Sequence, residues 1–395
     1  MRVADAVPDR RVQIHVLLAA SLVTLSMGSL YAWSVYLIPM EEALRGNRTI
    51  VSLIFATATF AFAIGMYFVP KFLRIWELTT LFWVLAAATF VAHGLTSSLD
   101  PFTVWLSYGL LFGLVNGIAY GSAIHAIQIH FKERRGLATG LVVASYALGA
   151  IIAVPLIEYS LQASGLSRTV FYQGTLVTTL TCVAAMFVRD RAGHRKPPPI
   201  EQDKRADVSL FFVLWAILFL ASCTGIMVLG HASAFLADPS QPQGVASAAA
   251  SVTGGNLLGR LAGGWFSDRS NPHRAVAALQ AMAAVSLTIL VLLPASFWLS
   301  IFAIGATGVA YGWIASAMPA IVGRVWGPAA VGRVYGQLFT AWGAAALVGP
   351  LMGGYIFDQV RSYVPVLVAA AAFTLAASIL IFAVDRQLSK ATESR

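Results

Sequence analysis

Long apolar blocks alternate with short polar segments along the whole chain. A helix of about 20 apolar residues spans the hydrocarbon core of a bilayer and satisfies its own backbone hydrogen bonds. The blocks are longer than the strands of a β-barrel and lack their strict alternation. The pattern therefore predicts an all-α membrane protein with twelve transmembrane helices. The twelve blocks are residues 14–39, 50–69, 79–97, 101–129, 137–161, 169–188, 209–236, 246–266, 275–293, 297–322, 335–356 and 364–384.

The composition agrees with this prediction. Of 395 residues, 58% are hydrophobic and 11% are charged, and the mean hydropathy is +0.76. Soluble domains carry about 25% charged residues. A single water-soluble core could not bury this much apolar surface, so we expect a large part of it to face lipid. The first block is too long for a cleavable signal peptide, and the same pattern continues after it.

The Lys and Arg residues gather on one side of the predicted membrane. If both termini are cytoplasmic, 21 of the 26 lie in cytoplasmic segments and four lie on the other side. This bias predicts cytoplasmic termini, and it explains the net charge of +9 without a nucleic-acid partner. Arg260 alone falls inside a predicted span. The four on the other side are Arg45, Arg48, Arg168 and Arg361.

The sequence carries no pattern that predicts catalysis. Cys182 and Cys223 both fall in apolar blocks, so neither a disulfide framework nor a metal site is indicated. The sequence contains no metal-ligand cluster, phosphate-binding glycine loop or nucleophile elbow. We therefore expect a protein that is not an enzyme, needs no cofactor or metal, and does not hydrolyse ATP.

The longest polar stretch lies between the sixth and seventh blocks. It runs from Arg189 to Ser209 and contains three consecutive prolines, residues 197–199. A charged, proline-rich segment of this kind is typical of a linker. We predict an N-terminal six-helix bundle over 1–188, a cytoplasmic linker over 189–208 and a C-terminal six-helix bundle over 209–395.

The two predicted bundles share a weak internal repeat in their fifth helices. Glycines and a central aromatic residue recur at one constant offset, and a proline follows one residue out of step. Two parallel repeats with a binding site at their interface are the architecture of a rocking carrier. The matched pairs are Gly136 and Gly332, Gly140 and Gly336, Tyr146 and Trp342, and Pro155 and Pro350.

Several segments resemble a known family. The eighth block ends in G-x-x-S-D-R at residues 264–269, which resembles the loop signature of the major facilitator superfamily. In that family Asp268 and Arg269 would act as a conformational latch, whereas the counterpart at 65–74 lacks the acidic residue. Segments 31–34 (YAWS), 134–140 (RRGLATG) and 335–343 (YGQLFTAWG) resemble the oxalate/formate antiporter family and the monocarboxylate porters. The resemblance extends over all twelve blocks and implies the major facilitator fold of two pseudo-symmetric bundles.

Arg260 is the strongest candidate for substrate binding. A guanidinium inside a hydrophobic span costs a few kcal/mol, so it must face the bundle interior and find an anion or a carbonyl. Its planar fork suits a carboxylate. In the resembled families an arginine at this position holds the substrate carboxylate. The alternative is a structural arginine that snorkels to the cytoplasmic end.

Two departures from the resembled families matter. The oxalate carriers place a lysine in the eleventh helix where this chain has Trp342, and losing that second cation favours a monoanion over a dianion. Vertebrate-type monocarboxylate carriers place an aspartate one turn before the arginine, where this chain has Asn256. Asn256 can orient Arg260 but cannot take up a proton.

Aromatic and titratable residues complete the predicted site. Tyr31, Tyr120, Tyr146 and Tyr311 fall at or near positions where the family lines its cavity, and ordinary interhelical packing is the alternative for each. His231 lies near the middle of a span, where we expect it to face the cavity, and is a candidate proton site, with a hydrogen-bonded packing role as the alternative.

We therefore expect a secondary carrier of small monocarboxylates such as formate, lactate or pyruvate, working by alternating access as an antiporter or a proton symporter. Its partners would be a small organic anion and the lipid bilayer, with no nucleic acid, and we expect a monomer in a cell membrane, the bacterial inner membrane. Two alternatives stay open. One is an exporter of drugs or neutral metabolites, and the other is a membrane receptor or scaffold that does not transport.

Overall fold

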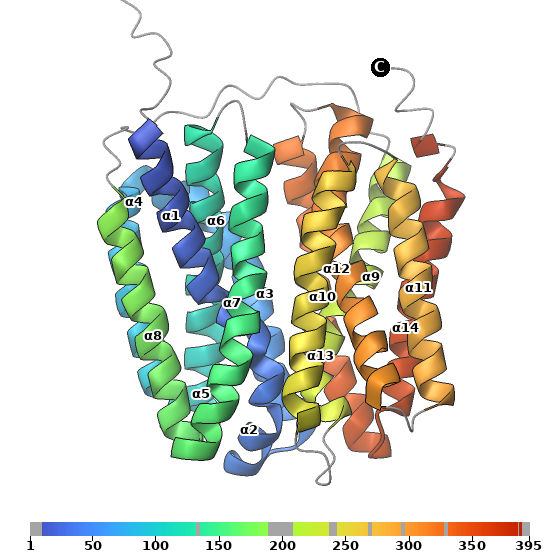
Figure 1. Cartoon of the computed structure of the whole chain (residues 1–395), viewed down its shortest axis with the longest axis horizontal. Helices are drawn as coiled ribbons and strands as arrows, with labels where there is room; N and C mark the ends of the chain where they lie inside the picture. Colours follow the sequence, from blue (N-terminus) through green and yellow to red (C-terminus); the bar gives the residue numbers. More distant parts are fainter. Residues whose placement is uncertain are drawn as a thin grey trace, which may run out of the picture.

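The computed structural model describes residues 10–131, 135–188, 208–236, 243–267, 271–293, 297–327, 331–385 and 387–388, and these form helices with short connections (Figure 1). In the first half of the chain the elements are α1 (Arg10–Met27), the 3-10 helix η1 (Gly28–Val35), α2 (Leu37–Ala43), α3 (Arg48–Ile75), α4 (Leu78–Thr96), α5 (Pro101–Val104), the π-helix η2 (Trp105–Phe112), α6 (Gly113–His130), α7 (Arg135–Ser164) and α8 (Leu166–Phe187). In the second half they are α9 (Val208–Phe235), α10 (Gln243–Ser267), α11 (Pro272–Leu292), α12 (Phe297–Trp326), α13 (Val331–Val360) and α14 (Val364–Ala383).

The helices form two bundles that lie side by side. Figure 1 shows α1 to α8 in one half and α9 to α14 in the other. The halves meet where α3 packs against α13 and where α7 packs against α10. The start of α1 and the end of α14 lie at one end of the molecule, here called the terminal end, and α2 lies at the opposite end, here called the α2 end (Figure 1).

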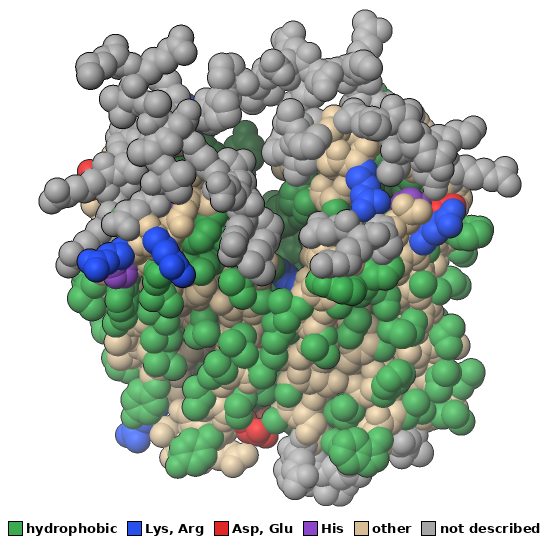
Figure 2. All heavy atoms as spheres, turned by 45° about the horizontal axis from the view of Figure 1, so that its top comes forward, with side chains coloured by type: hydrophobic (Ala, Val, Ile, Leu, Met, Phe, Trp, Pro, Cys, Tyr) green, Lys and Arg blue, Asp and Glu red, His purple; other side chains and the backbone are tan. Residues whose placement is uncertain are grey.

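The predicted membrane-spanning helices are present. Within the described residues, eleven spans are long and apolar enough to cross a bilayer. The eighth predicted block coincides with α10, whose 25 residues reach about 38 Å. Helix α10 is less apolar than the eleven because it carries glycines, serines, Asn256 and Arg260. On the side of the molecule that Figure 2 shows, hydrophobic side chains cover much of the surface between the two ends, as expected of a surface in contact with lipid.

Local sequence signals set several helix starts. Asn47 caps α3, because its Oδ1 accepts a hydrogen bond from the backbone N–H of Ile50 at 3.0 Å. Asp100 caps α5 in the same way through Thr103 N at 2.9 Å, with Pro101 at the first helical position. The hydrogen bond from the Thr103 backbone lowers the pKa of Asp100. Both caps replace hydrogen bonds that the first turn of a helix cannot make internally.

Glycines bring α10 and α12 into close contact. A Cβ atom on Gly259 would lie 2.1 Å from Val309 O, and one on Gly312 would lie 2.2 Å from Asn256 O. Because neither distance leaves room for a side chain, the backbones touch along this seam. The contact fixes the stretch of α10 that carries Asn256 and Arg260.

Candidate functional site

Arg260 lies on α10 of the second half, near tyrosines of both halves. Its Nε donates to Oδ1 of Asn256, one turn earlier, at 2.9 Å. The residue is half-buried, and within the described part of the chain no carboxylate forms an ion pair with it. Its charge also lies within electrostatic reach of the hydroxyl groups of Tyr120, Tyr31 and Tyr311. The guanidinium is therefore held in position by neutral groups, and its charge is not neutralised.

A chain of hydrogen bonds joins the halves beside Arg260. Trp342 on α13 donates its indole N–H to the hydroxyl of Tyr311 on α12 at 2.8 Å. The hydroxyl of Tyr311 is in turn 3.2 Å from that of Tyr31 on η1, in the other half. All three side chains are buried. These hydrogen bonds thus connect two phenol groups and an indole across the interface of the halves.

Tyr146 and Asn116 support the site from the N-terminal half. Asn116 on α6 donates from Nδ2 to Met27 O at 2.7 Å, and its Oδ1 accepts from the Tyr146 hydroxyl at 3.2 Å. The ring of Tyr146 meets the rings of Tyr31 and Tyr120 edge to face, at centroid distances of 5.0 and 5.3 Å. Tyr146 therefore sits between two other tyrosines and fixes their spacing.

Further aromatic residues, which were not predicted as site residues, contact the tyrosines and Trp342 around Arg260. Phe62 on α3 lies 5.3 Å from Tyr120 and 5.4 Å from Trp342, measured between ring centroids. Phe339 stacks on Trp342 at 5.1 Å and lies 5.9 Å from Tyr335. Tyr335 and Phe339 belong to the 335–343 segment that carried the family resemblance, so that segment held a usable signal. Phe62 had none, because a phenylalanine in an apolar span is unremarkable.

The structure brings most of the predicted site residues together. Those that meet at the interface of the halves are Arg260, Asn256, Tyr31, Tyr120, Tyr146, Tyr311 and Trp342. His231 lies elsewhere, in a network at the α2 end. Asp268 and Arg269, the predicted latch, lie outside the described residues. Among the described residues, no group of His, Cys, Asp and Glu side chains could hold a metal ion.

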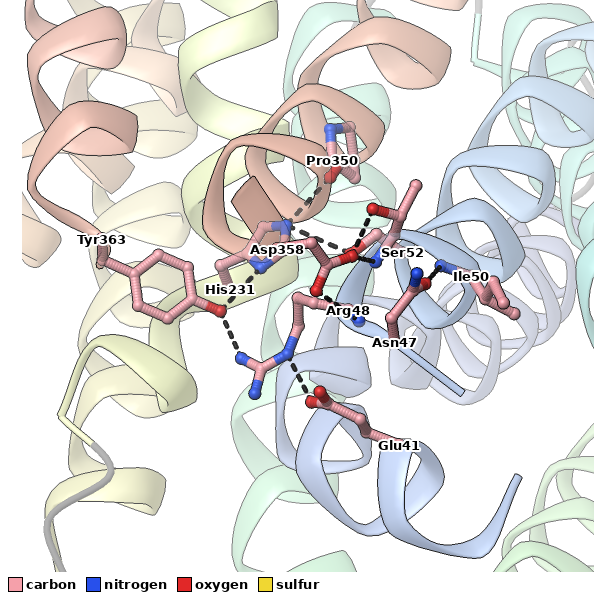
Figure 3. A network of polar contacts seen from close by, with 10 residues as sticks. Glu41, Asn47, Arg48, Ile50, Ser52, His231, Pro350, Asp358 and Tyr363 are labelled. Carbon is pink, nitrogen blue, oxygen red and sulfur yellow. Dashed lines mark hydrogen bonds and ion pairs between the residues drawn. The ribbon is translucent and has the colours of Figure 1, made fainter. Parts of the chain in front are cut away.

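His231 on α9 takes part in contacts between the halves. Its Nε2 is 2.9 Å from Pro350 O and 3.4 Å from the hydroxyl of Ser52 on α3, and its Nδ1 is 3.2 Å from the Tyr363 hydroxyl (Figure 3). A carbonyl can only accept, so Nε2 carries the hydrogen and Nδ1 accepts from Tyr363. Burial raises the pKa of Tyr363, which keeps its hydroxyl protonated and able to donate.

Arg48 and Asp358 join the halves next to His231. Asp358 on α13 accepts from the backbone N–H groups of Arg48 at 3.0 Å and Thr49 at 2.7 Å, and from the Thr49 hydroxyl. A carboxylate of one half thus binds the N-terminus of a helix of the other half, where the helix dipole favours negative charge. The Arg48 side chain pairs with Glu41 at 2.6 Å, as Figure 3 shows. We call Glu41, Arg48, Thr49, Ser52, His231, Asp358 and Tyr363 the α2-end network.

The two ends of the molecule differ in how the halves are joined. Hydrogen bonds between described residues of the two halves lie in the middle and towards the α2 end; two further ones join Thr59 to Ala346 O at 3.2 Å and Ser233 to Ser34 at 3.1 Å. Towards the terminal end, Figure 2 shows a hollow between the halves. The Arg260 site therefore lies between a joined end and a hollowed end.

Comparison with known proteins identifies the fold family. The chain matches the Major Facilitator Superfamily over residues 16–238 and 210–395. The chain belongs to the major facilitator superfamily. Members of this superfamily are membrane transporters and not enzymes, so the protein is a multi-pass secondary transporter.

Relatives and solved structures agree with this assignment. The chain is 25% identical to the oxalate:formate antiporter of Oxalobacter formigenes over 388 residues, covering 94% of this chain and 91% of that one. It is 24% identical to human monocarboxylate transporter 11, covering 77% and 68%. It is also 24% identical to the uncharacterized transporter YhjX of Escherichia coli, covering 84% and 85%. The fold resembles a bacterial homolog of the lysosomal transporter Spinster, with a TM-score of 0.73, 13% identity and coverage of 97% and 99%.

Proposed function

We propose that this transporter carries small organic monoanions, of the formate, lactate or pyruvate type, by alternating access. The observation that carries the proposal is the uncompensated charge of Arg260 at the interface of the halves. A charge in this setting is costly unless an anion neutralises it, so a bound carboxylate would recover part of that cost. The sequence similarity to a carboxylate antiporter and to a monocarboxylate transporter supports the same substrate class.

A single negative charge suits the site better than two. Arg260 is the one Lys or Arg side chain that the described residues bring into the central cluster, and the tyrosines and Trp342 around it are neutral. A dianion would leave its second carboxylate facing phenol and indole groups, which compensate charge less than a cation does. The site therefore favours one carboxylate.

The hollow at the terminal end gives the substrate a route on one side. The bias of Lys and Arg towards this end supports a cytoplasmic location for it. In this arrangement the halves meet at the α2 end, and the Arg260 site faces the cytoplasm. Rocking of the halves would break the α2-end network and open the opposite route.

Energy coupling follows from the charge of the substrate. Entry of an anion against a negative membrane potential costs about 2.3 kcal/mol per charge per 100 mV, so uptake needs a co-transported cation or an anion that moves in the opposite direction. Asn256 cannot carry a proton. We propose exchange of one anion for another, with His231 as the candidate group for any coupled proton.

The test compares binding by wild-type protein and the Arg260→Lys variant. Lysine keeps the charge but loses the two-pronged geometry, so we expect carboxylate binding to weaken at least tenfold while folding stays normal. The measurement is the thermal shift of purified protein with formate, lactate, pyruvate and oxalate, followed by uptake into proteoliposomes. At 100 times its dissociation constant, a ligand stabilises by about 2.7 kcal/mol.

The matched control is Arg274→Lys. Arg274 is an exposed arginine of the same half that pairs with Asp385, away from the central cluster. This control should bind and transport like wild type. Unchanged transport in Arg260→Lys, or tighter binding of oxalate than of any monocarboxylate, would contradict the proposal.

A second candidate function is export of an aromatic or neutral metabolite. It is favoured by the many aromatic rings at the site and by 21% identity to the aspyridones efflux protein apdF of Emericella nidulans. In that case neutral aromatic compounds would stabilise the protein, and the Arg260→Lys substitution would leave their binding unchanged.

A further inference from the structure

The hydroxyl groups around Arg260 do not all have a hydrogen to offer. Each tyrosine hydroxyl carries one hydrogen and can also accept, whereas the indole of tryptophan can only donate. Buried polar hydrogens are nearly always directed at an acceptor. The hydrogen bonds in the structure therefore indicate which tyrosine hydrogens are already in use and which remain for a ligand.

Trp342 sets the direction of the hydrogen bonds on one side of the site. Its N–H donates to Tyr311, so the Tyr311 oxygen is an acceptor in that bond. Among the described residues, the acceptor that contacts the Tyr311 hydroxyl is the oxygen of Tyr31, 3.2 Å away. Because the Tyr311 oxygen already accepts from Trp342, we assign the donor role in this contact to Tyr311. The hydrogen of Tyr31 then has no protein acceptor in the described part of the chain, and it lies within reach of the Arg260 charge.

Tyr146 is the opposite case. Its hydroxyl donates to Asn116 Oδ1, and the amide of Asn116 is itself anchored on Met27 O. The carbonyl oxygen of that amide can only accept, so the Tyr146 hydrogen is committed. Tyr146 spaces Tyr31 and Tyr120 through ring contacts but offers a ligand no hydrogen.

We infer that Trp342 is a positioning residue, which acts through Tyr311 to turn the hydroxyl hydrogen of Tyr31 towards the anion held by Arg260. This inference rests on the proposed function, because it assumes an anion at Arg260. The hydrogen-bond chain runs Trp342 to Tyr311 to Tyr31 to ligand, and it crosses from one half to the other. Consecutive bonds of the same direction also strengthen one another.

In this series of hydrogen bonds Trp342 acts through its N–H group, so an aromatic ring without an N–H cannot take its place. Phenylalanine at 342 would still stack on Phe339 and pack near Phe62, but it has no N–H. Tyr311 could then accept from Tyr31, which would turn the Tyr31 hydrogen away from the ligand. We expect the Trp342→Phe variant to bind lactate about 10- to 100-fold more weakly than wild type does, as expected for the loss of one hydrogen bond to a charged group.

The experiment is a double-mutant cycle in lactate binding, measured by calorimetry on purified protein. The four proteins are wild type, Trp342→Phe, Tyr31→Phe and the double variant. If Trp342 acts through Tyr31, its substitution weakens binding in wild type but has no further effect once the Tyr31 hydroxyl is gone. A control variant, Trp298→Phe, changes an exposed tryptophan and should bind like wild type.

Two results would overturn the inference. One is an equal loss from Trp342→Phe in both backgrounds, which would mean that the indole acts by packing alone. The other is wild-type binding by Trp342→Phe. If that variant fails to fold, a benzothienylalanine at position 342 keeps the ring size and replaces the N–H by sulfur, and the same cycle applies. A wild-type protein that binds no monocarboxylate contradicts the proposed function itself, so the two failures are distinguishable.

Discussion

Arg48 and Arg260 both lie where the two halves meet, and their surroundings differ. The Arg48 guanidinium pairs with Glu41, donates to Tyr363 and lies 4.6 Å from the centre of the Phe357 ring. Arg260 has Asn256 and tyrosine hydroxyls around it, with no carboxylate partner among the described residues. One arginine is neutralised by the protein and closes an end of the molecule. The other leaves its charge for a ligand.

The difference in role between Arg48 and Arg260 would be contradicted if the two arginines responded alike to loss of charge. We expect Arg260→Gln to reduce anion transport by more than 100-fold and to leave stability unchanged or slightly raised, because it removes an uncompensated charge. Arg48→Gln should instead lower the free energy of unfolding by about 1–3 kcal/mol, since Glu41 and Tyr363 lose their partner. Uptake into proteoliposomes and chemical unfolding in detergent measure the two effects. Destabilisation by both variants would show that Arg260 is also a structural residue.

The next test addresses the contact of Asp358 with the start of α3. Asp358→Asn removes the negative charge at the helix N-terminus and should weaken the joined end by about 1–2 kcal/mol. We expect the halves to separate more often at the α2 end. Spin labels at Glu42→Cys and Gln359→Cys, in a background without Cys182 and Cys223, would report a broader and longer distance distribution.

Asp100 provides the control for that measurement. Asp100 caps α5 within one half, so Asp100→Asn leaves the contacts between the halves intact. Its label distances should match wild type. An unchanged distribution in Asp358→Asn would mean that the α2-end network does not hold the halves together.

His231 offers a smaller and more specific effect. Glutamine at this position can donate to Pro350 O and accept from Tyr363, but it cannot titrate. We expect anion exchange in His231→Gln within about threefold of wild type and loss of pH-driven uptake. Exchange between loaded liposomes and uptake driven by a pH gradient separate the two. If both persist, the histidine serves only the contact between the halves.

The smallest effect is expected at a carboxylate that joins helices within one half. Asp385 accepts two hydrogen bonds from Arg274, at 3.0 and 3.1 Å, and this lowers the pKa of Asp385. A carboxylate whose pKa is lower in the folded state stabilises the fold at pH values above its unfolded pKa of about 4. This stabilisation is lost as the pH falls through the lower pKa of the folded state. Because the pair is exposed, we expect Asp385→Asn to lower the Tm by about 2 °C or less at pH 7. A larger change in Tm, or any change in label distances at the α2 end, would contradict this.

The sequence predicted the helices well because lipid imposes a simple rule on them. A span must be long and apolar, and the twelve blocks coincide with observed helices within several residues. Arg260 could be found for the same reason, since a charge in a span is exceptional. Helix α10 was the hardest span to predict from apolarity, because its glycines and polar residues make it the least apolar of the predicted spans.

The α2-end network could not be predicted in this way. Arg48 and Asp358 lie near helix ends, where charged residues are ordinary, and 310 residues separate them. The sequence suggested that His231 faces the central cavity, whereas its ring contacts Pro350, Tyr363 and Ser52. Helical periodicity gives the face of a residue but not its height or its partner on another helix. The repeat between α7 and α13 was visible, but Phe62 on α3 gave no signal.

The capping of α3 by the opposite half has a consequence for solvent. Asp358 shields the amide hydrogens of Arg48 and Thr49 from water only while the halves are together at the α2 end. When they part, those two amides lose their acceptor and must bind water instead. The rate of hydrogen–deuterium exchange at these two amides therefore reports how often this end opens, and its measurement needs neither a label nor a substitution. We expect exchange to slow under any condition that holds the halves together at this end, and it can be measured on the unmodified protein in a membrane.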